Sequence, residues 1–78
     1  MKEKLEYATL NHEATGQKIK QIMKEKNLTV GDIQDYLDFQ AVQGIYRWFQ
    51  GRSMPSLDNL YALSKLFQVP IDEILCGN

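Results

Sequence analysis

The stretch TVGDIQDYLDFQAVQGIYRWFQG, residues 29–51, has the pattern of two short helices joined by a tight turn. Apolar side chains recur at helical spacing on both sides of a break at residues 38–39. The first stripe consists of Ile33, Tyr36 and Leu37, and the second consists of Val42, Ile45, Trp48 and Phe49. Because an apolar stripe is stabilised by burial, we expect both helices to face one shared core.

The second of these helices, expected over about residues 41–50, has a polar opposite face. This face consists of Gln40, Gln43, Gly44, Arg47 and Gln50. Amide and guanidinium groups can hydrogen-bond the edges of DNA bases. Arg47 is the strongest candidate, because a guanidinium can grip guanine or phosphate with two hydrogen bonds. The alternative for each side chain is ordinary surface polarity.

Length and composition indicate one ordinary globular domain over residues 1–78, with 44% hydrophobic and 24% charged residues. We find no apolar run of about 18 residues and no signal peptide, so we expect a cytoplasmic protein without a membrane segment. The net charge of −1 argues against indiscriminate binding to nucleic acid. Residues 1–54, however, hold eight basic against seven acidic residues, so any DNA-binding face is expected there.

The residues that could support catalysis or metal binding are few. Cys76 is the single cysteine and His12 the single histidine, so neither a disulfide nor a structural zinc site is expected. The sequence contains no nucleophile–base pair and no phosphate-binding glycine loop. We therefore expect no cofactor, no metal and no enzymatic activity.

Local signals predict where the helices begin and end. A first helix is expected over about residues 15–26. Asn11 could cap a longer helix, but Gly16 inside it would cost about 1 kcal/mol relative to alanine. Asn27 suits a left-handed helix stop, and residues 29–32 have the spacing of a capping box that starts the second helix. Asp38 stands where that helix must stop, and residues 1–10 could be a short strand or a flexible arm.

The C-terminal third predicts two more helices. Gly51 is expected to end the third helix, and Ser56 to cap a fourth. The core residues expected on the fourth helix are Leu57, Leu60, Tyr61, Leu63, Ser64 and Phe67. Pro70 opens a last helix over residues 71–76. The expected fold is therefore all-α, with a helical core over residues 15–76 and no additional ligand-sensing domain.

Over roughly residues 15–75 the chain resembles the lambda-repressor and Cro-like (XRE-type) helix-turn-helix regulators. The matching segments are Thr15-Gly16-x-x-Ile19-Lys20, Leu28-Thr29, Ile45-Tyr46-Arg47-Trp48-x-x-Gly51, Pro55-Ser56-Leu57-Asp58-Asn59-Leu60 and Val69-Pro70-Ile71-Asp72-Glu73-Ile74-Leu75. The turn is similar to that of a low-GC bacterial subgroup and is one residue longer than the commonest form. The resemblance implies a compact five-helix domain, with the motif at helices two and three, that binds a double-stranded DNA operator.

The resemblance also suggests residues that contact the DNA backbone. A glutamine is frequent at the start of helix two and touches phosphate, but Val30 stands here, so a backbone N–H of Thr29 or Val30 would have to replace it. Tyr46 and Arg52 flank the polar face and could bind phosphates. Gly44 replaces a common alanine, which either permits close approach to DNA or has no role.

Two functions remain open at this level. The first is a homodimeric transcriptional regulator whose dimer contact is expected from the apolar segment 69–75. We expect a repressor, because a reader with no effector domain can act by occupying a promoter. The alternative is a protein-binding module or antitoxin-like partner with weak or no DNA binding. The acidic balance, Val30 and Phe49 support the alternative, since an exposed Phe49 would suggest a partner surface. A Phe49 buried against the fourth helix would not suggest such a surface.

Overall fold

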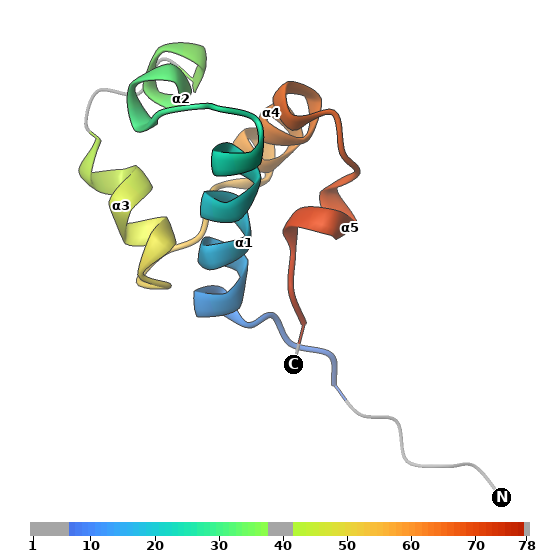
Figure 1. The fold of residues 1–78 in the computed structure, drawn as a ribbon. Coiled ribbons are helices and arrows are strands. Elements are labelled where there is room, and N and C mark those ends of the chain that lie inside the picture. The colour runs from blue at the N-terminus through green and yellow to red at the C-terminus, as the bar shows by residue number, and fades with distance from the viewer. Residues whose placement is uncertain (1–6, 38–41, 78) are drawn as a thin grey trace, which may run out of the picture.

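The computed structural model describes residues 7–37 and 42–77. Within them lie five helices: α1 (His12–Glu25), α2 (Val30–Leu37), α3 (Gln43–Phe49), α4 (Leu57–Phe67) and α5 (Ile71–Ile74). Helix α1 occupies the middle of the molecule, with α3 on one side, α4 and α5 on the other, and α2 near its C-terminal end (Figure 1). The expected all-α, five-helix architecture is confirmed.

Helix α1 begins three residues earlier than the predicted start at residue 15, so the preference for the shorter helix was wrong. The Ala14 N–H donates to Asn11 Oδ1 at 2.9 Å, which caps the longer helix. Gly16 is buried inside it, and a Cβ atom there would overlap the carbonyl oxygen of Trp48 and lie 2.7 Å from its carbonyl carbon. The glycine therefore lets the backbones of α1 and α3 touch, which compensates for its low helix propensity. At the other end, Asn27 has the predicted left-handed conformation, with φ 59°.

The predicted capping box at the start of α2 is confirmed. The Thr29 N–H donates to Asp32 Oδ2 at 2.8 Å, and the Asp32 N–H donates to Thr29 Oγ1 at 3.1 Å. Each side chain thus satisfies a backbone group that the first turn leaves unpaired. The predicted end of this helix at Asp38 lies outside the described residues, as do the turn and Gln40.

Helix α3 ends at Phe49, and Gln50, predicted to be its last residue, is the capping position. Gly51 follows with φ 72°, as predicted for a left-handed cap. The Gly51 N–H donates to the Trp48 carbonyl at 3.0 Å, and the Arg52 N–H donates to the Arg47 carbonyl at 2.9 Å. These bonds turn the chain away from α3 and place Arg52 beside its last turn.

The core is built from the inward stripes of the helices. Its fully buried apolar members are Ile19, Ile33, Ile45, Leu63, Phe67 and Ile74. Ile33 and Ile45 lie in the same cluster, which confirms that α2 and α3 share one core. Phe49 is only 7% exposed, so the alternative of a buried side chain holds. The expectation for Tyr36 was wrong, because its side chain is 46% exposed.

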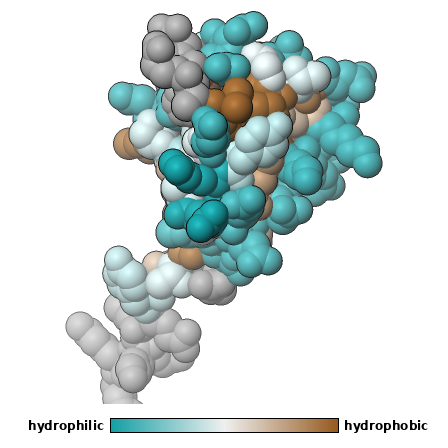
Figure 2. Space-filling model, turned by 90° about the vertical axis from the view of Figure 1, so that its left-hand side faces the viewer, coloured by the Kyte–Doolittle hydropathy of each residue, from teal (hydrophilic) through white to brown (hydrophobic). Residues whose placement is uncertain are grey.

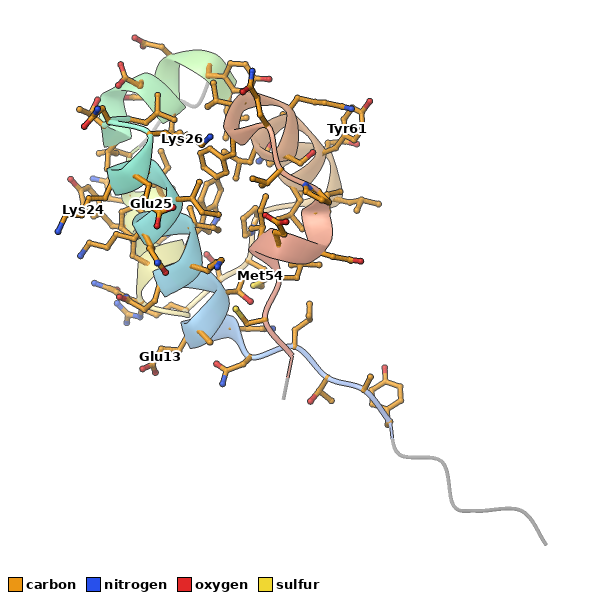
Figure 3. All side chains as sticks on the ribbon, turned by 45° about the vertical axis from the view of Figure 1, so that its right-hand side comes forward. Glu13, Lys24, Glu25, Lys26, Met54 and Tyr61 are labelled. Atoms are coloured by element: carbon orange, nitrogen blue, oxygen red, sulfur yellow. The ribbon has the colours of Figure 1, made fainter. Side chains whose placement is uncertain are left out.

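Helix α4 is capped as predicted, with the Asn59 N–H donating to Ser56 Oγ at 3.1 Å. The burial predicted for Leu60, Leu63, Ser64 and Phe67 is confirmed, but that of Leu57 and Tyr61 was wrong. Leu57 is 74% and Tyr61 58% exposed. These two side chains lie one turn apart on the outward face, and Tyr61 points away from the molecule (Figure 3).

The C-terminal segment leaves the helical conformation earlier than predicted. Helix α5 ends at Ile74 rather than at residue 76. The Cys76 N–H donates to Thr15 Oγ1 at 3.0 Å, and the Asn11 N–H donates to the Cys76 carbonyl at 2.8 Å. An isolated antiparallel bridge joins Leu10 to Gly77. These contacts hold the segment in an extended conformation against the start of α1.

Candidate nucleic-acid interface

The outward face of α3 brings polar side chains together in one shallow hollow of about 250 Å³. Its lining residues are Gln43, Tyr46, Arg47, Gln50 and Arg52. All five side chains are exposed, and positions 43, 47 and 50 share a face because they are separated by about one helical turn. Of the predicted base-reading side chains, Gln43 and Arg47 therefore lie together, whereas Gln40 lies outside the described residues.

The rotation of α3 is set by its other face. Ile45, Trp48 and Phe49 are buried in the core, so the polar face must point outward. The Gln17 side-chain amide on α1 donates to the Phe49 carbonyl at 2.9 Å and satisfies an acceptor in the last turn of α3. Together with the direct contact at Gly16, this bond attaches α3 to α1.

The residues flanking this face are partly held in place. The ring of Tyr46 meets that of Phe49 edge to face, with centroids 5.9 Å apart. Arg52 Nη1 lies 3.5 Å from Gln50 Oε1, a long and weak hydrogen bond. The guanidinium of Arg52 can therefore move to an external acceptor at little cost. Gly44, which the sequence placed on the same face, is half-buried.

The start of α2 offers less than predicted for phosphate binding. Thr29 is exposed and Val30 half-buried, but the Thr29 N–H already donates to the Asp32 carboxylate. Of these two amides, that of Val30 remains for an external acceptor. The adjacent negative charge of Asp32 also weakens the attraction of this helix terminus for a phosphate.

A larger hollow of about 570 Å³ lies between α1, the start of α2 and α3. Leu28, Val30 and the ring of Tyr46 supply apolar surface above the buried Met23 and Phe49. Lys20 and Lys24 stand along α1. The sequence carried no signal for this hollow. It forms where residues 17–30 meet residues 46–50, so helical periodicity could not reveal it.

Other kinds of site receive no support among the described residues. No group of three or more His, Cys, Asp or Glu side chains is placed to hold a metal ion there. Cys76 is a half-buried free thiol. None of the described helices combines the length and the hydropathy required to cross a bilayer.

A family model described as helix-turn-helix matches residues 19–74. The chain belongs to the XRE-type helix-turn-helix family of DNA-binding regulators. It is 34% identical over 61 residues to the HTH-type transcriptional activator BcrR of Enterococcus faecalis. That match covers 78% of this chain but only 29% of BcrR, so the chain spans less than a third of the length of this relative.

Solved structures of helix-turn-helix proteins have the same fold. The S. venezulae BldD DNA-binding domain superposes with a TM-score of 0.67 at 17% identity, covering 83% of this chain and 96% of that chain. The clp gene regulator ClgR of C. glutamicum superposes with a TM-score of 0.70 at 15% identity, covering 85% of this chain and 84% of that chain. At these identities the likeness establishes the fold alone.

Proposed function

We propose that this protein is a sequence-specific DNA-binding transcriptional regulator that reads the major groove with α3. The observation that supports the proposal best is the division of α3 into two faces. Ile45 and Trp48 are buried, while Gln43, Arg47 and Gln50 project outward from one face. An α-helix fits the major groove, and its outward amide and guanidinium groups match the hydrogen-bonding edges of bases.

We assign the contacts by side-chain chemistry. Arg47 and Gln43 read base edges, and the sequence adds Gln40 as a third candidate. Tyr46, Arg52 and the N–H of Val30 bind phosphates and position the helix without reading sequence, and Thr29 supports them by capping α2. Gly44 allows the backbone of α3 to approach the DNA closely.

We further propose that the protein binds as a homodimer, with two copies of α3 about 34 Å apart on successive turns of DNA. The segment 69–75 remains the proposed contact. Val69, Pro70 and Ile71 line a hollow with Tyr61 between α4 and α5. Ile74 is buried in the core of its own chain, so the half-buried Val69 and Ile71 would supply the apolar contact instead.

The sign of regulation follows from where the operator lies. We propose repression, because occupation of a promoter is sufficient to block it, and action on DNA in the cytoplasm. The relative BcrR is described as an activator. A promoter–reporter fusion measured with and without the protein decides between the two, since a repressor lowers the signal and an activator raises it.

A protein-binding role is the second candidate. The net charge of −1 favours it, as do the exposed side chains of Leu57 and Tyr61 on α4. On this alternative the protein would be a partner module, such as an antitoxin, with weak or no affinity for DNA.

A selection from random duplex DNA with the purified protein tests the leading proposal. We expect an enriched motif with two-fold symmetry. Binding to it should weaken by about a thousandfold between about 50 and 200 mM salt if six or more phosphates are contacted. A folded protein that enriches no motif would transfer support to the protein-binding role.

Replacing Arg47 with alanine is expected to weaken binding to the enriched site by about 1–3 kcal/mol, or roughly 5- to 150-fold. The melting temperature should not change, because the side chain is exposed. Lys65→Ala is the control for charge, since it removes one exposed positive charge from α4. Because Lys65 also lines the hollow at the proposed dimer contact, the oligomeric state of this variant is measured by sedimentation before its affinity is compared. Equal losses in the two variants would mean that Arg47 contributes only net charge.

A further inference from the structure

The hollow between α1, the start of α2 and α3 combines an apolar floor with a cationic rim. The half-buried Leu28 and Val30 and the exposed ring of Tyr46 supply its open apolar surface, and its volume is about 570 Å³. Pockets of roughly 300–1,000 Å³ are typical of small-molecule sites. On the side of the molecule seen in Figure 2, a patch of hydrophobic atoms lies open among hydrophilic side chains.

Among the described residues, the charged side chains that line the hollow are both lysines, although the Asp32 carboxylate lies at one end, hydrogen-bonded to the Thr29 N–H. Lys20 and Lys24 lie one turn apart on α1, and none of the described residues lining the hollow is Asp or Glu. Lys20 Nζ lies 5.8 Å from the centroid of the Phe49 ring, a cation–π contact that holds the ammonium group over the floor. Lys24 points outward from α1 (Figure 3). A bound anion would therefore meet the Lys20 ammonium group at the edge of an apolar surface, and the flexible Lys24 side chain could turn to join it.

DNA phosphates alone do not account for this combination. A phosphodiester would use the lysines but gain nothing from covering Leu28, Val30 and Tyr46. The floor favours an apolar body, and the ring of Tyr46, which is 50% exposed, favours a flat aromatic one. We propose that this groove binds a small aromatic monocarboxylate, with the ring on the apolar floor and the carboxylate between Lys20 and Lys24.

Such a ligand would regulate the DNA-binding surface. Tyr46 and Gln50 line both this groove and the hollow on the outward face of α3, and Thr29 and Val30 line the groove as well. A ligand that seats against these residues competes with the phosphate contacts assigned to Tyr46 and Val30. This coupling depends on the proposed DNA-binding function, whereas binding of the ligand does not.

The direct test is titration of 2-naphthoate into the ¹⁵N-labelled protein without DNA, followed by amide chemical shifts. We expect saturable shifts at Val30 and Phe49 and none at Tyr61 on α4. The neutral isostere 2-naphthamide should bind at least tenfold more weakly. The double variant Lys20→Gln/Lys24→Gln should lose at least tenfold in affinity for naphthoate, and Lys65→Gln should lose none.

The second measurement is the affinity of the protein for its selected DNA site with and without saturating 2-naphthoate. We expect at least a tenfold loss in the parent protein and none with 2-naphthamide. Unchanged DNA affinity with an occupied groove would overturn the regulatory role.

The outcomes separate the two proposals. Shifts at Val30 and Phe49 in a protein that selects no DNA motif would support the ligand site and reject the DNA-binding function. A protein that binds its operator but shows no naphthoate shifts at the groove would reject the ligand site alone. Equal affinity for naphthoate and naphthamide, or for the parent and the double variant, would also reject it.

Discussion

Gly16→Ala is expected to lower the free energy of unfolding by about 3 kcal/mol or more. A Cβ atom at this position would overlap the carbonyl oxygen of Trp48 and lie 3.1 Å from the carbonyl carbon of Phe49. Both neighbours are backbone atoms of α3, so no side-chain rotation relieves the overlap. The two helices must separate, which also disturbs the hydrogen bond from Gln17 to Phe49. Because a domain of this size has a total stability of about 4–12 kcal/mol, the loss would remove about a quarter to three quarters of it.

Gly31→Ala is the matched control for this experiment. Gly31 is also a helical glycine, but a Cβ atom there would meet only Thr29 Oγ1, at an ordinary distance of 3.6 Å. The substitution should be neutral or stabilise α2 by up to about 1 kcal/mol. Urea denaturation of the parent and both variants measures the difference. Equal midpoints for Gly16→Ala and Gly31→Ala would refute the close contact between α1 and α3.

Ile45→Ala is expected to cost about 2–5 kcal/mol of stability. The side chain is 0% exposed and belongs to the core cluster that joins α3 to the other helices. Its removal takes apolar atoms from the core and leaves a cavity that the surrounding helices fill only partly. The folded fraction of the variant should retain its affinity for DNA, because Ile45 is on the inward face of α3. The two variants are therefore distinguishable: Ile45→Ala should lower stability but not DNA affinity, and Arg47→Ala should lower DNA affinity but not stability.

Leu57→Ala is the control for Ile45→Ala, since it truncates an aliphatic side chain that is 74% exposed on α4. We expect its effect to remain within about 0.5 kcal/mol. Thermal melts of both variants provide the comparison. A melting temperature for Ile45→Ala equal to that of the parent would mean that α3 is rotated differently and that its reading face has been misassigned.

The sequence by itself determined the features that depend on neighbours within one helical turn. Thr29 and Asp32 cap each other, Ser56 caps α4, and Asn27 and Gly51 adopt left-handed conformations, all as predicted. These interactions join residues a few positions apart, so residue type and spacing are sufficient to specify them. The buried stripe of α3 follows equally from helical periodicity, and with it the outward position of Arg47.

Only the tertiary structure decided the features that depend on contacts between distant segments. Gly16 is unfavourable by helix propensity alone, and its role is explained only by the Trp48 carbonyl that packs against it. Helix α5 ends early because the Cys76 N–H donates a hydrogen bond to Thr15, 61 residues away. Leu57 lies outward although its residue type favours burial. The groove between α1, α2 and α3 is likewise formed only when the helices pack. The helix propensities of most residue types differ by about 1 kcal/mol or less, so the packing of helices against one another overrides them.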